Sequence, residues 1–514
     1  MIKNTSNRVI VNSLILYGKM GITMFISLYT TRLILSALGA SDFGIYNIVG
    51  GTIGLMGFLN ACLVTATQRF MSYYQGKQDM ELLRNVYNIS LIIHALMALI
   101  VCTLVWLIGD AFFTTILNIP EQRIHSAKIV YHCMCITMGI SLITVPFDSI
   151  VNAHENMLYY AVVGIIENML KLTVAFICVY VVCDKLVIYG QLMTMIQCIL
   201  LVLMFSYCKR HYSECTFNPK KYWSTTMAKH ITKYIGWNFL SSFSMTITNY
   251  GLSIVTNHFF GVLLNTALGL AQQIDTQLKV FSTNMLKALN PVIAKSEGEG
   301  NSDKVVRASL IGSKFSCYIF VFFSVPFWIE APYIMNLWLG NVPDWAVLFC
   351  RMQLIASLIG QLTCTFPTAI AAKGDIKKYS ILTSVVYIWS ICQTMIFFYL
   401  QLPPYSLYIS VIVFNVIAYR IIGMLIVHSK YCISLHYIIK TCIYPCMAVM
   451  ASSFIAGSLP ALFVQANIMR LVMTVTLSSL ATSIAIYSIG TTKDEKEKLF
   501  TVIIKFKNLL IRKK

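Results

Sequence analysis

The sequence predicts an all-α polytopic membrane protein with about fourteen transmembrane helices. Hydrophobic residues make up 57% of the chain and charged residues only 11%, with a mean hydropathy of +0.72; a soluble chain carries roughly a quarter charged residues. Apolar windows of about 20 residues, the length that spans a bilayer, recur from one end to the other. They lie at 10–38, 44–66, 86–108, 127–151, 160–183, 186–207, 233–257, 262–288, 309–331, 346–371, 378–400, 404–428, 440–459 and 466–489.

The basic residues are distributed in a way that predicts orientation. Most of the 39 lysines and arginines fall in the predicted inner segments, whereas the outer loops hold only Arg123 and Lys185. Cytoplasmic loops are enriched in such residues, so both termini are expected in the cytoplasm. The net charge of +19 therefore reflects topology and attraction to anionic membrane lipids rather than a nucleic-acid site. The first apolar run is too long for a cleavable signal peptide and lacks a small-residue cleavage site.

An internal repeat is visible in the spacing of glycine and proline. Gly39 in the first predicted hairpin is matched by Gly261, and the segment 139–146 by 360–367, each beginning with glycine and ending with proline. An even number of helices separates the partners, which predicts parallel repeats related by an axis along the membrane normal. We expect a six-helix lobe at 1–207, a cytoplasmic linker at 208–232, a second six-helix lobe at 233–428, two appended helices at 429–489 and a basic cytoplasmic tail at 490–514.

The first hairpin carries a recognisable motif. Its apolar helix is expected to break at Leu38-Gly39 and to restart after Gly44. The pattern R-x-x-L-x-x-L-G-x-x-x-x-G-x-Y at 32–46 resembles the first hairpin of bacterial polysaccharide exporters. These are the O-antigen and lipid-linked oligosaccharide flippases of the MATE-like superfamily that also contains multidrug extruders and the lipid II flippase.

The resemblance implies a flippase rather than an enzyme. Such a protein moves a polyprenyl-diphosphate-linked oligosaccharide across the bacterial inner membrane by alternating access between two lobes. The first and seventh helices would line its cavity. The resemblance implies no cofactor, although H⁺ or Na⁺ coupling is open, and it implies glycosyltransferases or a glycan polymerase as neighbours in the pathway.

Polar stripes mark the first and seventh predicted helices. Lys19 begins one stripe, and Asn238 and Asn249 belong to the other. A charge in hydrocarbon is costly and normally faces a protein interior or a wet cavity, whereas hydroxyl and amide groups also serve helix packing. We interpret both stripes as cavity-lining. Besides those three residues they contain Thr23, Ser27 and Thr30, and Ser242, Thr246 and Ser253.

Two acid–lysine pairs lie at membrane depth. Glu167 precedes Lys171, and Asp275 precedes Lys279, by four residues in an order that favours ion pairing along a helix. Each pair either neutralises itself or divides its roles, with the lysine binding an anionic substrate and the acid exchanging a coupling ion. Asp148 is a third acid with that potential role.

The remaining intramembrane cations differ in their expected roles. Lys19 has no acid three or four residues away and is the lysine we expect to meet the diphosphate. Arg32 belongs to the family-like motif and is a further substrate-binding candidate. Arg351, Arg420 and Arg470 are predicted to extend their guanidinium groups toward a membrane face.

Two alternatives remain open. A cation-coupled multidrug extruder of the same superfamily would need intramembrane acids to hold its cation, and basic residues dominate here. A polytopic glycan polymerase or ligase would need catalytic residues on a substantial outer loop, and the predicted outer loops are short. The 16 cysteines lie mostly in spans and show no zinc-ligand spacing, so no metal site is expected.

Overall fold

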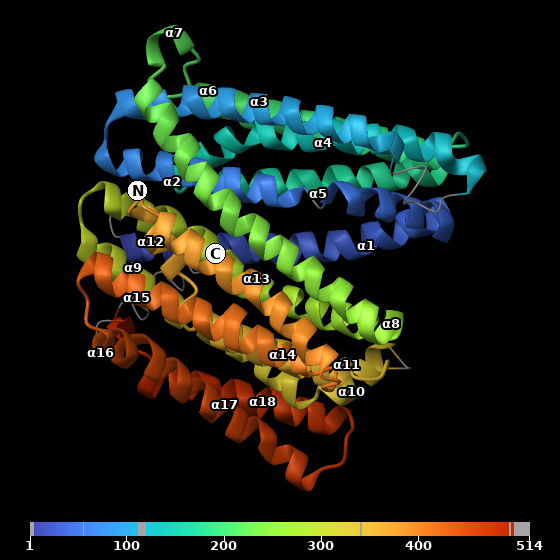
Figure 1. Cartoon of the computed structure of the whole chain (residues 1–514), viewed down its shortest axis with the longest axis vertical. Coiled ribbons are helices and arrows are strands. Elements are labelled where there is room, and N and C mark those ends of the chain that lie inside the picture. The colour runs from blue at the N-terminus through green and yellow to red at the C-terminus, as the bar shows by residue number, and fades with distance from the viewer. Residues whose placement is uncertain (1–4, 55, 112–119, 340–341, 493–494, 498–514) are drawn as a thin grey trace, which may run out of the picture. The chain divides into compact units, whose positions relative to one another are not determined.

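A computed structural model describes residues 5–54, 56–111, 120–339, 342–492 and 495–497 of the chain. Within these ranges the structure is predominantly helical and contains no β-strand (Figure 1). It is a polytopic all-α membrane protein, as the composition predicts. The elements are α1 (Thr5–Gly54), α2 (Gly57–Lys77), α3 (Met80–Ala111), α4 (Glu121–Ala153), α5 (Met157–Tyr180), α6 (Lys185–His211), α7 (Pro219–Tyr222), α8 (Thr225–Gly298), α9 (Ser302–Ile329), α10 (Ala331–Leu339), α11 (Ala346–Gln361), α12 (Phe366–Ala372), α13 (Lys377–Tyr399), α14 (Ser406–Ser410), η2 (Val411–Ala418), α15 (Tyr419–Tyr431), α16 (Leu435–Ile438), η3 (Ile439–Ile443), α17 (Tyr444–Phe463), α18 (Ile468–Ala485) and η4 (Ile486–Gly490).

Ten helical segments among the described residues are long and apolar enough to cross a membrane. The bent pair α11–α12 would make an eleventh. The other predicted spans, 44–66, 233–257 and 262–288, coincide with parts of α1, α2 and α8, which are helical but do not pass the same test of length and hydropathy. The count of fourteen and the orientation of the termini stay predictions.

Two glycines break the longest helices in the same way. Gly39 interrupts α1 with φ 77° and ψ 166°, and Gly261 interrupts α8 with φ 77° and ψ −173°. This extended backbone with positive φ is essentially restricted to glycine. The predicted break at Leu38-Gly39 is confirmed, but the helix resumes directly after Gly39 and not after Gly44 as predicted. The two glycines matched by sequence spacing share one backbone conformation.

The second matched pair differs between the two halves. Pro146 lies inside the continuous helix α4. Pro367 lies instead in the first turn of α12, after a break that bends α12 by 42° from α11. Proline removes a backbone donor and restricts the residue before it, so a helix either bends at this residue or restarts there. In the second half of the chain the helix restarts at the proline.

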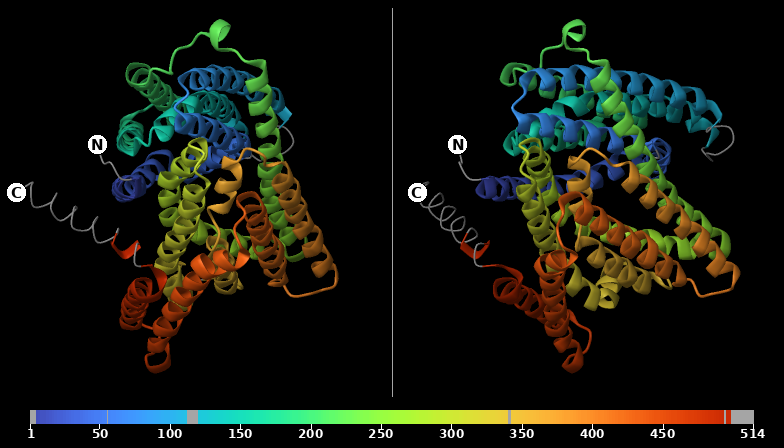
Figure 2. Two further views of the ribbon diagram at one scale, coloured as in Figure 1. Left: turned by 90° about the vertical axis from the view of Figure 1, so that its left-hand side faces the viewer. Right: turned by 60° about the vertical axis from the view of Figure 1, so that its left-hand side comes forward.

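Leu14–Ser242 and Gly298–Gly300 form one compact unit, here unit 2. Its centre is α4, which packs against α2, α3 and α6, and these helices run alongside one another in Figure 2. Buried residues of α4 such as Val130, Leu142 and Val145 face these neighbours. The α1 segment from Leu14 onward and α5 belong to the same unit, which therefore contains most of the residues predicted for the first lobe.

Residues of the predicted linker at 208–232 form hydrogen bonds and an ion pair with helices of unit 2. Asn88 of α3 is fully buried, donates to the Thr216 carbonyl (2.9 Å) and accepts from the Asn218 amide (2.8 Å). Glu214, also buried, pairs with His154 at 2.5 Å. The predicted bounds of the linker were too wide, because α6 extends to His211 and α8 begins at Thr225; the short helix α7 lies between them.

The remaining described residues, mainly Phe243–Glu297 and those from Asn301 onward, form unit 1. Helix α9 is its centre and packs against α11, α17 and α18. Its residues Cys317, Phe320 and Val321 are completely buried in a large apolar cluster. Helices α17 and α18 form an antiparallel pair, drawn in red in Figure 1, beside this core.

Two buried ion pairs attach α18 and the segment after it to α9. Glu330, at the C-terminal end of α9, is fully buried and accepts from Arg470 Nε (3.0 Å) and Nη2 (2.7 Å) and from the Thr474 hydroxyl. Lys314, 2% exposed, pairs with Glu495 at 2.8 Å. Arg470 thus has an ionic partner in Glu330, which was not predicted.

Candidate functional site

Lys19 belongs to α1, and its side chain lies in the contact between α1 and α5 in unit 2. Its ammonium stands 4.5 Å from the centre of the Tyr160 ring, a cation–π distance. The end of the side chain also lies against Gly164, where an added Cβ would be 2.2 Å from both Cε and Nζ. The absence of a side chain at position 164 thus provides the space that the Lys19 ammonium occupies.

The predicted pair on α5 continues from this contact. Glu167 Oε1 and Lys171 Nζ are 2.6 Å apart, and both side chains are about one-third exposed, at 34% and 35%. Tyr160, Gly164, Glu167 and Lys171 recur at helical spacing, so they share one face of α5. Glu167 is about 10 Å along the helix axis from Tyr160. The structure thus brings Lys19 and the Glu167–Lys171 pair onto one polar stripe.

Of the other predicted residues of unit 2, Asp148 lies within electrostatic range of Tyr160 and so adjoins this stripe. Arg32 is exposed on α1. Asp148 is partly buried near the end of α4, and its backbone carbonyl accepts from Asn152. Asn238 donates to the Cys62 carbonyl of α2 (2.9 Å), which is a helix-packing contact.

The α1 hydroxyl groups in the Lys19 stripe bond to their own helix. Thr23 donates to the Met20 carbonyl and Thr30 to the Ile26 carbonyl. Threonine commonly forms such a bond within a helix. These two residues therefore give less support to a polar cavity than their spacing indicates.

Asp275 and Lys279 form the corresponding pair in unit 1, where Asn249 is exposed on the same helix, α8. Asp275 is 4% exposed, and its Oδ2 accepts from Lys279 Nζ (2.6 Å) and Gln353 Nε2 (3.0 Å). Its Oδ1 is buried and has no hydrogen-bond partner among the described residues. A buried carboxylate oxygen without a donor is costly, so this oxygen is suited to bind a proton or a small cation.

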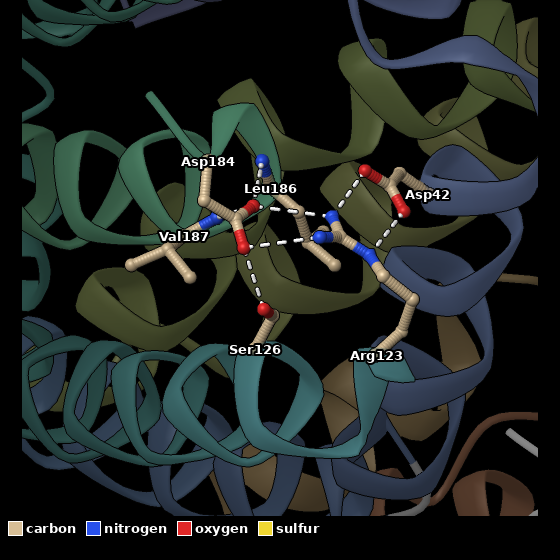
Figure 3. A network of polar contacts seen from close by, with 6 residues as sticks. All are labelled: Asp42, Arg123, Ser126, Asp184, Leu186 and Val187. Atoms are coloured by element: carbon tan, nitrogen blue, oxygen red, sulfur yellow. Dashed lines mark hydrogen bonds and ion pairs between the residues drawn. The ribbon is translucent and has the colours of Figure 1, made fainter. Parts of the chain in front are cut away.

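Arg123, which was predicted only as an outer-loop charge, organises a network of four side chains (Figure 3). Its guanidinium pairs with Asp42, which follows the α1 break, and with Asp184, the N-cap of α6, at 3.1 Å. Ser126 of α4 donates to Asp184 at 2.5 Å. Arginine presents several donors in a rigid fork and can bridge two carboxylates. The network joins α1, α4 and α6 at one end of unit 2.

The Asp184 carboxylate should make this network sensitive to acid. Partial burial raises the pKa of Asp184, but hydrogen bonds from Ser126 and Arg123 lower it more, and the net pKa lies below the usual 3.8. A lowered folded-state pKa adds stability above the unfolded pKa, and that stability is lost as the pH falls through the lowered value. We expect the melting temperature of Asp184→Asn to be below wild type at pH 7 and 5, with the difference becoming smaller as the pH falls below 3.8. A difference that persists unchanged at pH 3 would show that ionisation of Asp184 does not contribute.

Arg351 is a second arginine with partners that were not predicted. Its Nε donates to the Trp328 carbonyl (3.0 Å) and its Nη2 to the Ile329 carbonyl (3.1 Å), while the guanidinium lies over the Trp328 ring. The last carbonyls of a helix have no partner within the helix. Arg351 therefore caps the end of α9. No pattern in the sequence indicates this, because the contact joins α9 to α11.

Comparison with known proteins adds family information for the first part of the chain. Residues 19–177 match the family model MatE. A search of curated proteins finds no match.

Several solved structures are similar over most of the chain. One is described as an outward-facing conformation of a multidrug resistance MATE family transporter of the MOP superfamily, with TM-score 0.72, 15% identity, and coverage of 84% of this chain and 97% of that one. A MATE structure in the bent conformation gives TM-score 0.72 at 16% identity, covering 83% and 95%. A MOP superfamily transporter from Pyrococcus furiosus gives 0.70 at 15%, covering 84% and 96%. At these identities the likeness shows that the chain has the MATE fold.

Proposed function

We propose that the protein is a MOP superfamily transporter that moves a polyprenyl-diphosphate-linked oligosaccharide across the bacterial inner membrane. The MatE match at 19–177 and the MATE fold support a transporter. The first-hairpin motif supports the flippase branch of the superfamily.

The surroundings of Lys19 support an anionic, phosphate-containing substrate. It places an ammonium group on a membrane-spanning helix, against the Tyr160 ring and the bare backbone of Gly164. Lys171 adds a second, one-third exposed ammonium on the same stripe. Charge-assisted hydrogen bonds to phosphate are strong where water is excluded. Lys19, Lys171 and Lys279, with Arg32, Asn238 and Asn249, are the substrate-binding residues of this proposal.

The acids supply the coupling in this account. Asp275, whose Oδ1 is buried without a partner among the described residues, is the first candidate to exchange H⁺ or Na⁺, with Glu167 and Asp148 after it. In this account the Asp275 carboxylate binds either the coupling ion or the Lys279 ammonium. Transport would alternate between these two states.

A multidrug extruder is the second candidate, and the same buried Asp275 oxygen favours it because organic cations require an intramembrane acid. One structure of this fold is a multidrug resistance transporter. The Pyrococcus furiosus transporter is described as having a binding pocket of reverse polarity that suggests a different function. The fold therefore accommodates pockets of different polarity, and we propose that the basic residues place this chain among transporters of anionic substrates.

Depletion of the protein in the organism that encodes it tests this proposal. We expect lipid-linked oligosaccharide to accumulate in the inner leaflet and surface glycan to fall, with both effects reversed by the wild-type gene. Unchanged glycan together with increased sensitivity to organic cations would overturn the flippase proposal in favour of the extruder.

A further inference from the structure

A second basic site lies in unit 1, where the helix α11–α12 is broken. Arg420 of α15 donates from Nη1 to the Thr363 carbonyl in this break (3.3 Å). Its Nη2 faces Gly360, where an added Cβ would lie 3.5 Å away. Arg420 forms no ion pair with any carboxylate of the described residues. Its charge is held at a helix break within unit 1.

Tyrosines surround this guanidinium. Arg420 stands 5.1 Å from the centre of the Tyr419 ring. That ring contacts Tyr379 (5.8 Å) and Tyr387 (5.5 Å), both on α13. The hydroxyl groups of Tyr379 and Tyr387 are within electrostatic range of Arg420. Three elements, α11–α12, α13 and α15, thus supply polar groups to one place.

Several of these groups are buried without a hydrogen-bond partner among the described residues. They are Arg420 Nε, the Tyr379 hydroxyl and the Thr363 hydroxyl, together with Asn415 Oδ1 one turn before Arg420. Tyr379 itself is 8% exposed, and its hydroxyl lies near that of Tyr419 but not at hydrogen-bonding geometry. Each buried donor left unsatisfied costs about 1–3 kcal/mol. Arg420 Nε can only donate and both hydroxyl groups can donate, so a ligand rich in acceptor oxygens would satisfy all three.

The backbone around the cluster is also irregular. The π-helical segment η2 ends at Ala418, directly before Tyr419. Single π-helical turns occur often at functional sites. Broken membrane helices are tolerated where they are buried in protein or line a wet cavity, and they commonly form substrate and ion sites. Arg420, Tyr387 and Tyr419 are only partly buried, which leaves the cluster an approach from outside.

We propose that Arg420, with the hydroxyl groups of Tyr379, Tyr387 and Thr363, forms a binding site for a phosphate-group oxyanion. Guanidinium binds phosphate in a bidentate manner, and the tyrosine and threonine hydroxyls donate to its remaining oxygens. The identity of the ligand as the diphosphate of the transported lipid rests on the proposed function, whereas the site itself does not. A phospholipid headgroup offers the same chemistry and is the other source.

Binding of farnesyl diphosphate and of inorganic pyrophosphate to the purified full-length protein, in phosphate-free detergent solution, tests this site. Arg420→Gln should weaken binding of both about ten- to a hundredfold, as the loss of a charged hydrogen bond implies. Arg420→Lys should lose part of that, since an ammonium cannot bind two oxygens in a fork. Tyr379→Phe and Tyr387→Phe, which remove only a hydroxyl, should each weaken binding severalfold.

The controls separate the site from nonspecific attraction and from misfolding. Arg307→Gln removes the same charge from an exposed position on α9, and Tyr444→Phe removes a hydroxyl from an exposed tyrosine. Both should bind as wild type does, and all variants should melt cooperatively. Equal losses for Arg420→Gln and Arg307→Gln, or wild-type binding by Arg420→Gln, would overturn the site.

Nanodiscs identify the source of the phosphate group. Farnesyl diphosphate binding that is the same in phosphatidylglycerol and phosphatidylcholine nanodiscs supports the transported lipid as ligand, and competition by phosphatidylglycerol that requires Arg420 supports a headgroup. Arg420-dependent pyrophosphate binding without any transport of lipid-linked oligosaccharide would retain the site and remove the proposed function. If Arg420→Gln binds both ligands normally and the protein transports lipid-linked oligosaccharide, the proposed function would be retained and the Arg420 site would be rejected.

Discussion

Lys19→Ala should reduce export of lipid-linked oligosaccharide at least tenfold while leaving the amount of protein in the membrane unchanged. The substitution removes an ammonium that the α1–α5 contact holds against Tyr160 and Gly164. A charged hydrogen bond to phosphate is worth about 1.5–3 kcal/mol, which corresponds to roughly a ten- to hundredfold effect. Surface glycan, normalised to protein level, is the measurement.

A glycine substitution tests the position of this charge separately from its presence. Gly164→Ala would place a methyl group where the end of Lys19 lies. The flexible side chain can move away at little cost to stability, so the ammonium is displaced but retained. We expect partial loss of export in Gly164→Ala and in Lys19→Arg, which keeps the charge with a different shape.

Gly236→Ala is the matched control for this pair of variants. Gly236 is a helical glycine of unit 2 with nothing within 4 Å of an added Cβ, so export should remain at the wild-type level. Normal export by Lys19→Ala at normal expression would contradict the assignment and leave Lys19 with a packing role only.

Arg470→Ala should destabilise the protein by about 3–5 kcal/mol, the typical cost of removing one partner from a buried ion pair. Glu330 is fully buried and takes two of its donors from Arg470, and only the Thr474 hydroxyl would remain. The expected result is a large drop in melting temperature, measured by size-exclusion chromatography of heated, detergent-solubilised protein.

The double variant Glu330→Gln with Arg470→Met shows whether the stranded charge causes this loss. A neutral glutamine can still accept from Thr474, so most of the stability should return. Asp375→Ala is the control, because Asp375 is 76% exposed in its pair with Lys430 and exposed pairs contribute little. A double variant as unstable as Arg470→Ala would contradict this explanation.

The fold follows from the sequence where the signal is local. Apolar windows of membrane length predicted an all-α membrane protein, and the break at Gly39 was predicted because a glycine interrupts an apolar run there. The cap of α3 is local as well, since Asp79 Oδ1 accepts from the Leu82 amide. The kink at Gly261 was found through its spacing from Gly39, and both glycines adopt the same backbone conformation.

The roles of the arginines could not be predicted because they depend on contacts between distant segments. Arg470 meets Glu330, Arg351 meets the end of α9, and Arg420 meets the break after α11. Hydropathy and spacing describe one helix at a time, and for an isolated helix the outward orientation of a guanidinium is the natural expectation.

In the candidate site too, contacts within one helix could be predicted and contacts between helices could not. The pairs Glu167–Lys171 and Asp275–Lys279 were predicted from spacing within one helix, and both form with 2.6 Å contacts. The involvement of Tyr160 and Gly164 with Lys19, and of Gln353 with Asp275, requires the packing of two helices. Whether these residues bind substrate stays a prediction.

Reconstitution in liposomes tests the flippase proposal most directly. Purified protein would be incorporated with a fluorescent polyprenyl-diphosphate oligosaccharide, and with ethidium in a parallel sample, and an impermeant quencher would report the lipid that reaches the outer leaflet. We predict transport of the lipid-linked oligosaccharide that Lys19→Ala reduces at least tenfold, with no transport of ethidium. Ethidium transport driven by an ion gradient, with the oligosaccharide lipid remaining in its leaflet, would contradict the proposed function.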